Sequence, residues 1–412
     1  MKLGNIISLV RGNTYKSALL SETEGPVLLG LGSIQRNGGF KCGTWKRYPG
    51  NSDSRILLHP GDLYVSLKDL TQSCDLLGAV ARVPLDMSEG RLTQDTVKLE
   101  FNPGLDAKTK LYTYWSLRTP QYRAYCKARG TGTTNMSLSR NDFLGWDIPA
   151  QSEARDVLVN LFELIELKIE ANIRLNGYLA ELQQAIYADS TKEGAQTTIG
   201  EIAEVIDCLH SKKPQRQPSG KPLIQLNNII DDGILNMTDT FYISEDDYAK
   251  WISRCEVKPG DCVITNVGRI GAVSQVPQGT TAAMGRNMTC IRPGAYAATV
   301  ITALCSNAMR YEIEKRTDAG TIMNALNVRN IPKLELYLPP AEVRDSVETT
   351  LKTIQDAREL LLKERQEFAA LRDVLLPKLM SGEIDVSKIN LTQLNSHLTK
   401  YFMSTMASLS IC

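Results

Sequence analysis

The sequence repeats itself, and this repeat constrains the fold more than any other feature. Short motifs of the first half recur in the second half in the same order. The matched pairs are LGNI at 3–6 with IGEI at 199–202, HPGDLYVSL at 59–67 with KPGDCVITN at 258–266, GAVARVP at 78–84 with GAVSQVP at 271–277, GTTNMSL at 132–138 with GTIMNAL at 320–326, and IPAQSEARD at 148–156 with LPPAEVRD at 338–345. Matches that keep one order indicate a tandem duplication. We therefore expect two copies of one structural unit.

Each copy begins with about 150 residues that contain short runs of β-branched, aromatic and leucine residues between turn-forming residues. These runs predict strands of a small mixed domain. They are VLLGLGSI at 27–34, LYVSL at 63–67, TVKLEF at 96–101, LIQLNNI at 223–229, CVITNV at 262–267 and MTCIRP at 288–293. The glycines of the repeated PGD and GAV motifs favour turns with close backbone approach rather than ligand contact.

Each copy ends in a segment with apolar residues spaced by three and four, which predicts a long helix over 152–188 and another over 343–379. The first stripe is Leu158, Phe162, Ile165, Ile169, Ile173, Leu179, Leu182 and Ile186; the second is Val347, Leu351, Ile354, Leu361, Phe368, Leu371, Leu375 and Leu379. About 37 residues at 1.5 Å each would span about 55 Å. This length favours a coiled coil over two surface helices that pack only on their own domains, although the second arrangement stays open.

Two similar helices on one chain most simply pair with each other. An antiparallel pair would relate the two domains by a pseudo-twofold axis. Polar residues interrupt both stripes and would fix the register of the helices. These residues are Asn172, Asn176, Gln183, Arg358 and Arg365. Two similar domains joined in this way suit a target with two separated halves, and DNA is the common target of that kind.

Composition limits the alternatives. The 412 residues carry a net charge of +1, with a basic excess in 1–150 and an acidic excess in 151–190. The N-terminus lacks the features of a secretory signal, and no stretch is long and apolar enough for a membrane span. Nine cysteines without a C-x-x-C pair argue against a disulfide framework. We expect a cytoplasmic protein.

The sequence offers little for catalysis or for a metal site. Its three histidines, His59, His210 and His397, are far apart, and we find no Cys or His beside them at metal-ligand spacing. The segment GLGSIQRNGG at 30–39 lacks the complete glycine pattern of a dinucleotide loop, so we interpret it as a turn. We expect no catalytic residue and no metal site in this chain.

Residues 371–384, LRDVLLPKLMSGEI, carry the most specific resemblance. Pro377 lies in the last turn of the second predicted helix, which we expect to stop at Ser381-Gly382. The order of domain, helix, domain and helix, the PGD and GAV motifs and this C-terminal stretch resemble the specificity (S) subunit of type I restriction–modification systems. The resemblance covers about 1–385.

The resemblance implies an α+β fold. Two tandem mixed α/β target recognition domains are each followed by a long helix, and the helices pair as an antiparallel coiled coil. The implied boundaries are 1–150 for the first recognition domain, 151–190 for the first helix, 191–340 for the second recognition domain and 341–384 for the second helix, with a tail at 385–412 to which we assign no function.

The resemblance also implies the function and the partners. The chain would be a non-catalytic subunit that binds a bipartite, asymmetric site in double-stranded DNA. It would direct adenine N6-methylation by two methyltransferase subunits and cleavage by restriction (translocase and nuclease) subunits. S-adenosylmethionine, ATP and Mg would bind to those partners rather than to this chain. Four leucines near the end of the second helix would contact the methyltransferase subunits: Leu371, Leu375, Leu376 and Leu379.

Basic and amide residues gather in glycine-rich or proline-rich segments, where they suit contacts with phosphates and base edges. The candidates for DNA binding in the first copy are Arg36, Lys41, Lys46, Arg47, Arg123, Lys127, Arg129, Thr133 and Asn135. Those in the second copy are Lys212, Lys213, Arg216, Gln217, Arg269, Arg286 and Asn287. The alternative is a duplicated coiled-coil scaffold that binds proteins without DNA recognition. An enzyme is the third possibility and lacks the expected motifs.

Overall fold

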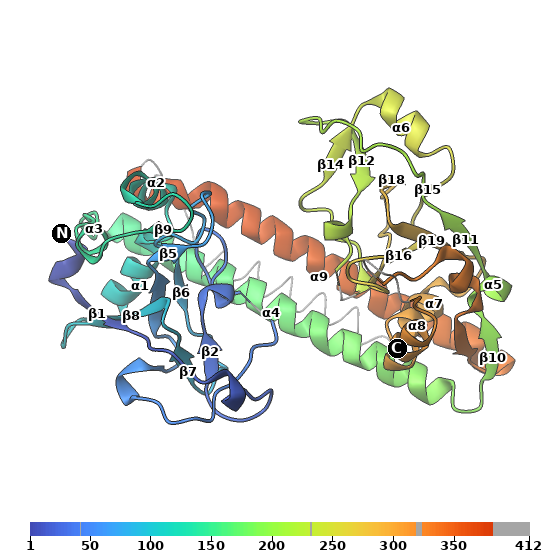
Figure 1. The fold of residues 1–412 in the computed structure, drawn as a ribbon, viewed down its shortest axis with the longest axis horizontal. Coiled ribbons are helices and arrows are strands. Elements are labelled where there is room, and N and C mark those ends of the chain that lie inside the picture. Colours follow the sequence, from blue (N-terminus) through green and yellow to red (C-terminus); the bar gives the residue numbers. More distant parts are fainter. Residues whose placement is uncertain (42, 231–232, 319–323, 382–412) are drawn as a thin grey trace. The chain divides into compact units, whose positions relative to one another are not determined.

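The computed structural model describes residues 1–41, 43–230, 233–318 and 324–381 (Figure 1). The predicted tail at 385–412 lies outside these residues. The described chain divides into two compact units. Unit 1 is Met1–Leu167 with the end of the last helix from Ala369, and unit 2 is Lys168–Phe368. No helix within the described ranges combines the length and apolar character that a membrane span requires.

Unit 1 is built on two main sheets. The first has the order β1-β8-β4-β6 with antiparallel neighbours, and the second has the order β2-β7-β3. The first sheet comprises β1 (Ile7–Arg11), β8 (Thr96–Phe101), β4 (Leu63–Ser66) and β6 (Val80–Arg82). The second comprises β2 (Val27–Leu29), β7 (Gly90–Leu92) and β3 (Leu57–Leu58). A short pair joins β5 (Lys68–Asp69) to β9 (Met136–Ser137).

Unit 2 repeats this arrangement and adds a strand to each main sheet. Its sheets have the orders β11-β19-β16-β17-β13 and β14-β12-β18-β15. The first comprises β11 (Ala203–Asp207), β19 (Met288–Pro293), β16 (Cys262–Thr265), β17 (Val273–Gln275) and β13 (Gly233–Ile234). The second comprises β14 (Phe241–Ile243), β12 (Lys221–Ile224), β18 (Ala282–Met284) and β15 (Glu256–Val257). A separate antiparallel pair joins β10 (Ala195–Thr198) to β20 (Glu335–Leu338).

The strand orders confirm the internal repeat. Strands β1, β8, β4 and β6 correspond to β11, β19, β16 and β17, and the parallel pair β2–β7 corresponds to β12–β18. The predicted strands are present, with two corrections. The segments 27–34 and 223–229 are strands only at their beginnings, because each turns into a 3-10 helix, Leu31–Ser33 and Leu226–Asn228.

The repeated glycines have the predicted structural role, for two different reasons. Gly61 and Gly260 of the PGD motifs have φ of 86° and 88°, which favours glycine, and an added Cβ would meet little. Gly78 and Gly271 of the GAV motifs have φ of 73° and 77°, and a Cβ would also approach Cys126 Sγ at 2.5 Å and the Ile313 side chain at 2.9 Å. Close approach therefore applies to the GAV glycines only.

Helices pack on the sheets of both units. Unit 1 contains α1 (Ala107–Ser116), α2 (Pro120–Arg129) and α3 (Arg140–Leu144), and unit 2 contains α5 (Ile199–Ile202), α6 (Glu245–Trp251), α7 (Ala297–Leu304) and α8 (Asn307–Lys315). Short 3-10 helices lie at Leu3–Asn5, Ser17–Leu19, Ser54–Ile56 and Val328–Lys333. The side chains of Thr119 and Ser306 cap α2 and α8 by accepting the amides of Tyr122 and Met309, which repeats the same N-cap in both units.

Two long helices contribute to both units: α4 (Glu153–Ser190) and α9 (Ala341–Ser381) (Figure 1). In unit 1, Phe162 of α4 and Leu376 of α9 are buried in the main core, where Phe162 packs against Trp115. In unit 2, Leu179 of α4 packs with Ile354 and Leu361 of α9. Both predicted helices are therefore confirmed.

The predicted apolar stripes are only partly right. Most of their members are buried or half-buried, but Leu182 is 47% exposed and Leu371 is 44% exposed. Gln183 is buried beside Leu182, so a polar residue takes the inward position at this turn. Pro377 lies inside α9, as expected for the end of this helix.

Candidate nucleic-acid interface

The first predicted basic segment of unit 1 is exposed. Lys41 is exposed, and Lys46 forms a surface ion pair with Glu22 at 3.1 Å. Arg47 is half-buried and donates from Nη1 to the carbonyl of Gly25 at 3.0 Å. Surface ion pairs of this kind contribute little to stability. These side chains are therefore available for a partner at small cost to the fold.

Arg36 and Arg123 belong to different predicted clusters, and the structure brings them together. Arg36 is exposed and lies 3.8 Å from the carboxylate of Asp75. Arg123 is 9% exposed and donates to the backbone carbonyls of Leu77, Cys74 and Asp75. Sequence reasoning placed Arg123 with the exposed candidates. Its terminal donors instead hold the segment before β6 in place, so we remove Arg123 from the proposed base-reading set.

The other candidates of unit 1 lie at the end of α2 and in the loop that leads to β9. Lys127, Thr133 and Asn135 are exposed. The guanidinium of Arg129 lies 3.8 Å from the ring centroid of Tyr125 and also 3.8 Å from Asp142. The backbone carbonyl of Thr133 accepts a hydrogen bond from Gln72 at 2.6 Å, which ties this loop to the segment after β5.

The predicted basic loop of unit 2 gathers around an aromatic ring. Lys213 Nζ and the Arg216 guanidinium lie 4.4 and 5.8 Å from the ring centroid of Phe241 on β14. Arg216 also pairs with Asp239 at 2.9 Å. Lys212 is exposed, and the backbone N–H of Gln217 donates to the carbonyl of Tyr242 at 2.9 Å. Cation–π contacts hold these cationic groups in place while their charges stay accessible to solvent.

The three remaining candidates of unit 2 are exposed at loops beside its sheets. The Nη2 atom of Arg269 already donates to the carbonyls of Leu226 and Ile229. Arg286 is exposed between β18 and β19. Asn287 follows with φ of 65°, a left-handed conformation that asparagine tolerates.

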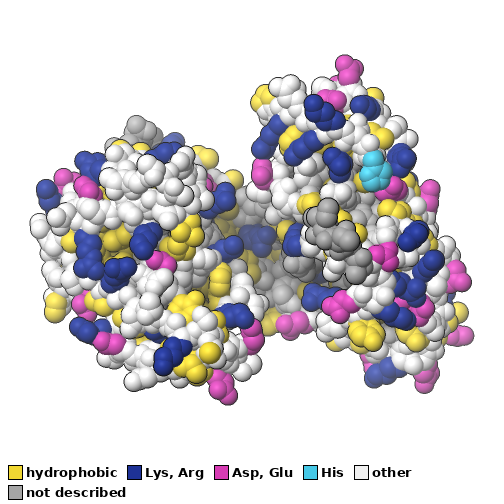
Figure 2. All heavy atoms as spheres, in the orientation of Figure 1, with side chains coloured by type: hydrophobic (Ala, Val, Ile, Leu, Met, Phe, Trp, Pro, Cys, Tyr) yellow, Lys and Arg dark blue, Asp and Glu magenta, His cyan; other side chains and the backbone are white. Residues whose placement is uncertain are grey.

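On the face that Figure 2 draws, the charges do not form a surface of one sign. In Figure 2, Lys and Arg side chains are scattered among acidic and neutral ones on the visible surface of each unit. This distribution agrees with the net charge of +1.

The four predicted partner-binding leucines differ in exposure. Leu371 is exposed and Leu375 is half-buried against the core of unit 1. Leu376 is 6% exposed and belongs to that core, which leaves little of its side chain for a partner. The side chain of Leu379 lies outside the described residues.

Sequence reasoning missed an arginine network between α4, α9 and the domain of unit 1. Arg118 and Arg372 both contact Glu166, at 3.5 and 3.0 Å. Burial alone would raise the pKa of Glu166, but the charges of these arginines outweigh it and lower that pKa. The residues of this network are scattered in the sequence, so their clustering could be found only from the structure.

A parallel network pairs Arg82 with Glu163 of α4 at 2.8 Å, and the Glu163 carboxylate also accepts the indole N–H of Trp115 at 2.7 Å. The Arg82 guanidinium lies 4.8 Å from the ring centroid of Tyr114. The beginning of α4 is therefore attached to the domain by charge-assisted hydrogen bonds as well as by apolar packing.

Within unit 2, amides join the same two helices to each other, and Lys168 of α4 forms an ion pair with Glu364 of α9 at 3.3 Å. Asn172 donates to Glu364 at 3.0 Å, Arg358 donates to Asn176 at 2.9 Å, and Gln183 donates to the carbonyl of Leu351 at 3.3 Å. Residues further along α4 contact residues earlier in α9, so the two helices run antiparallel within this unit. Polar residues in such a seam fix its register, as the sequence predicts for Asn172, Asn176, Gln183 and Arg358.

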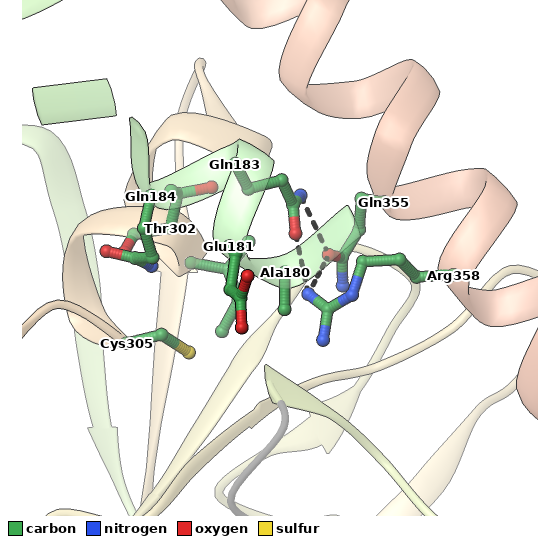
Figure 3. Close-up of a pocket in the computed structure, with 9 residues that line it drawn as sticks. Ala180, Glu181, Gln183, Gln184, Thr302, Cys305, Gln355 and Arg358 are labelled. Carbon is green, nitrogen blue, oxygen red and sulfur yellow. Dashed lines mark hydrogen bonds between the residues drawn. The ribbon is translucent and has the colours of Figure 1, made fainter. Parts of the chain in front are cut away.

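Figure 3 shows part of this layer beside a cavity of about 320 Å³. Arg358 donates to Gln183 Oε1 at 2.6 Å and to Gln355 Oε1 at 3.4 Å. Gln355 donates to the carbonyl of Gly233 at 3.4 Å, which links α9 to strand β13. The cavity is lined by amides, the Arg358 guanidinium and apolar groups, together with Glu181, Thr302 and Cys305.

One group of possible metal ligands was missed by the sequence reasoning. Ligand atoms of Asp207, Cys208 and His210 lie within 4.8 Å of one another. Asp207 already accepts from His210 at 2.9 Å and from Arg254 at 3.2 Å. Burial raises the pKa of the Cys208 thiol, which opposes the thiolate form that binds metals. We interpret this group as an ion pair at the end of β11.

No protein-family model matches the sequence, and no curated protein matches it. The structure is similar to the S subunit of the type I restriction–modification system from M. genitalium, with 15% sequence identity, a TM-score of 0.55 and coverage of 92% of this chain and 95% of that chain.

Two further solved structures match over similar lengths. One concerns complex assembly and conformational transition of the type I R-M system, with 14% identity, coverage of 93% and 97%, and a TM-score of 0.35. The other is the HsdS subunit from Thermoanaerobacter tengcongensis, with 15% identity, coverage of 93% and 96%, and a TM-score of 0.31. The repeated units, the long helices and the M. genitalium structure agree, and the chain has the fold of a type I restriction–modification S subunit.

Proposed function

We propose that this protein is the DNA sequence-recognition subunit of a type I restriction–modification system. The observation that carries the proposal is the internal repeat: two units with the same strand order, each with basic loops, in a chain with the S-subunit fold. Each unit would read one half of a bipartite, asymmetric site. Such a division of labour requires two similar readers that differ in their loops.

The long helices would act as the spacer between the two half-sites. The antiparallel contacts of α4 and α9 in unit 2 support a coiled coil whose polar layer fixes its register. A fixed register would give a fixed separation, and with it a defined number of unread base pairs between the half-sites. The two recognition domains would be related by a pseudo-twofold axis.

The chain would act without a catalytic site of its own. Two methyltransferase subunits would bring S-adenosylmethionine for adenine N6-methylation, and restriction subunits would bring ATP and Mg. Exposed apolar residues near the end of α9, Leu371 and Val374, support a docking surface for the methyltransferase subunits. Because the net charge is only +1, we expect strong DNA binding to need the partner subunits.

The test is selection of DNA by the complex of this chain with its methyltransferase subunits. Bound molecules from a pool of randomised duplexes are sequenced. We expect one motif with two specific halves and a spacer of constant length. Recovery of no motif from a complex that assembles normally would contradict DNA recognition and favour the scaffold alternative.

A variant pair separates DNA contact from assembly. Replacing Lys212 and Lys213 by alanine should lower the affinity for all duplexes and reduce the slope of the salt dependence by about one for each phosphate that is no longer neutralised. Replacing the exposed Lys192 and Lys315 by alanine removes the same charge from unit 2 outside the predicted loops. Equal loss of affinity in both variants would indicate a non-specific charge effect.

A further inference from the structure

A cavity of about 370 Å³ in unit 1 is lined by four arginines. Arg36 comes from the loop after the 3-10 helix at Leu31–Ser33, Arg118 and Arg123 from α2 and the turn before it, and Arg372 from α9. The one acidic residue of the lining is Asp373, which pairs with Arg372 at 2.8 Å.

Two of these arginines are buried, and each has one N–H donor without a hydrogen-bond partner. Arg118 and Arg123 are 5% and 9% exposed, and the buried Nε atoms of both have no hydrogen-bond partner. Their terminal nitrogens are engaged: Arg118 Nη1 donates to Tyr114 and Glu166, and Arg123 donates to backbone carbonyls. A buried N–H without an acceptor costs free energy. These two guanidinium groups line the cavity, so an anion bound there would lie beside their positive charges.

The charges around the cavity leave a positive balance. Four arginines face Asp75, Glu166 and Asp373, each of which pairs with one or two of them. Glu166 is buried, yet its pKa is lowered because the arginine charges outweigh the effect of burial. The cavity therefore favours a negative group.

We propose that this cavity is an oxyanion site that binds a phosphate group. The planar guanidinium fork matches the geometry of phosphate oxygens. Arg36, whose side chain is 83% exposed, stands at the opening and belongs to the predicted DNA-binding segment 36–48, so a backbone phosphate of DNA would approach along basic residues. Free inorganic phosphate carries the same group. The proposal does not depend on sequence recognition by the protein.

The direct test is NMR of the arginine Nε–Hε groups in the full chain during titration with inorganic phosphate. The resonances of Arg118 and Arg123 are assigned from the spectra of Arg118→Lys and Arg123→Lys. We expect both to shift and to saturate, because a phosphate in the cavity would lie beside both guanidinium groups. Arg55 is the internal control: it is exposed, pairs with Asp53 and does not line the cavity.

Matched variants measure how much Arg36, at the opening of the cavity, contributes to phosphate binding. Arg36→Gln should weaken phosphate binding roughly threefold in titration calorimetry, the scale expected for one exposed charge. Arg55→Gln removes the same charge elsewhere in unit 1 and should leave the affinity unchanged. Both positions are exposed, so neither variant endangers folding.

Three results would overturn the proposal: no saturable shift of Arg118 and Arg123, an equal shift of Arg55, or a response to acetate without a response to phosphate, which would indicate a site for a protein carboxylate. A short DNA duplex then shows whether the bound phosphate group comes from the DNA backbone or from free phosphate. Displacement of bound phosphate by the duplex assigns the site to the DNA backbone, and retention of phosphate assigns it to free phosphate. Failure to select a DNA motif would contradict the proposed function and leave this result intact.

Discussion

Glu166 of unit 1 and Glu359 of unit 2 both lie on the long helices, and their pKa values shift in opposite directions. Arg118 and Arg372 lower the pKa of Glu166 against the effect of burial. Burial raises the pKa of Glu359 to about 7. The backbone N–H of Gln278 acts against this shift, and the charge of the nearby Asp356 adds to it. Local partners, rather than the repeated fold, decide which form of each carboxyl is stable.

The difference extends to the whole attachment of α4 and α9. Unit 1 uses ion pairs and aromatic packing, with Glu163 and Phe162 as the main contacts from α4. Within unit 2, an amide layer around Arg358 joins the two helices to each other, beside an ion pair between Lys168 and Glu364. A duplicated domain can therefore keep its strand order while the helix contacts diverge. We expect the two attachments to respond differently to mutation and to pH.

The largest expected effect comes from Phe162→Ala in the aromatic contact of unit 1. Phe162 is fully buried, and its removal should lower the free energy of unfolding of unit 1 by about 4 kcal/mol. Hydrogen exchange of β8 compared with β19 would localise the loss to unit 1. Leu182→Ala, on an exposed position of the same helix, should cost less than about 0.5 kcal/mol. A loss shared equally by both strands would contradict separate attachment.

Glu166→Gln should destabilise unit 1 by about 2 kcal/mol near pH 7, because two buried arginines lose their charged acceptor. The folded pKa lies below the ordinary value of 4.5, so this contribution is fully present above pH 4.5 and is lost as pH falls through the lower folded pKa. Hydrogen exchange of unit 1 at several pH values would measure the difference between variant and wild type. A difference that does not shrink in acid would show that the charge of Glu166 is not the cause.

Glu359→Gln should have the opposite effect and stabilise unit 2. The pKa is raised from an ordinary 4.5 to about 7, so the folded state holds a proton that the unfolded state releases, and the wild type loses stability as pH rises from about 4.5 to 7. The neutral variant avoids this loss and should be more stable by about 1 kcal/mol at pH 8, allowing for the partial exposure of the group. Unfolding of unit 2 at pH 5 should show little difference between the two proteins. Equal stability at pH 8 would argue against a raised pKa of Glu359 in the folded protein.

The smallest expected effect on stability is that of Arg216→Ala in the basic loop of unit 2. Its ion pair with Asp239 is exposed, so the change should be within about 0.5 kcal/mol. The DNA affinity of the assembled complex should fall at the same time, as filter or polarisation assays would show. Loss of stability without loss of affinity would assign Arg216 to the fold, as the contacts of Arg123 do in unit 1.

The sequence was sufficient for the repeat, most strands and both long helices, because each depends on local patterns that recur. It failed where burial depends on distant elements. Leu182 fits the apolar spacing but is exposed, and Arg123 sits among basic residues but is buried. Arg118 and Arg372 are far apart in the sequence and meet at Glu166 only in the folded chain. The candidate DNA-binding residues stay predictions, and the positions of those that are exposed are compatible with that role.

The central claim is that this chain selects the DNA sequence on which its partners act. The most direct measurement is a genome-wide map of methylated adenines in the native host with and without this gene. The proposal predicts that one bipartite motif loses methylation when the gene is deleted and regains it on complementation. An unchanged map in a host whose methyltransferase subunits are expressed and active would contradict the claim.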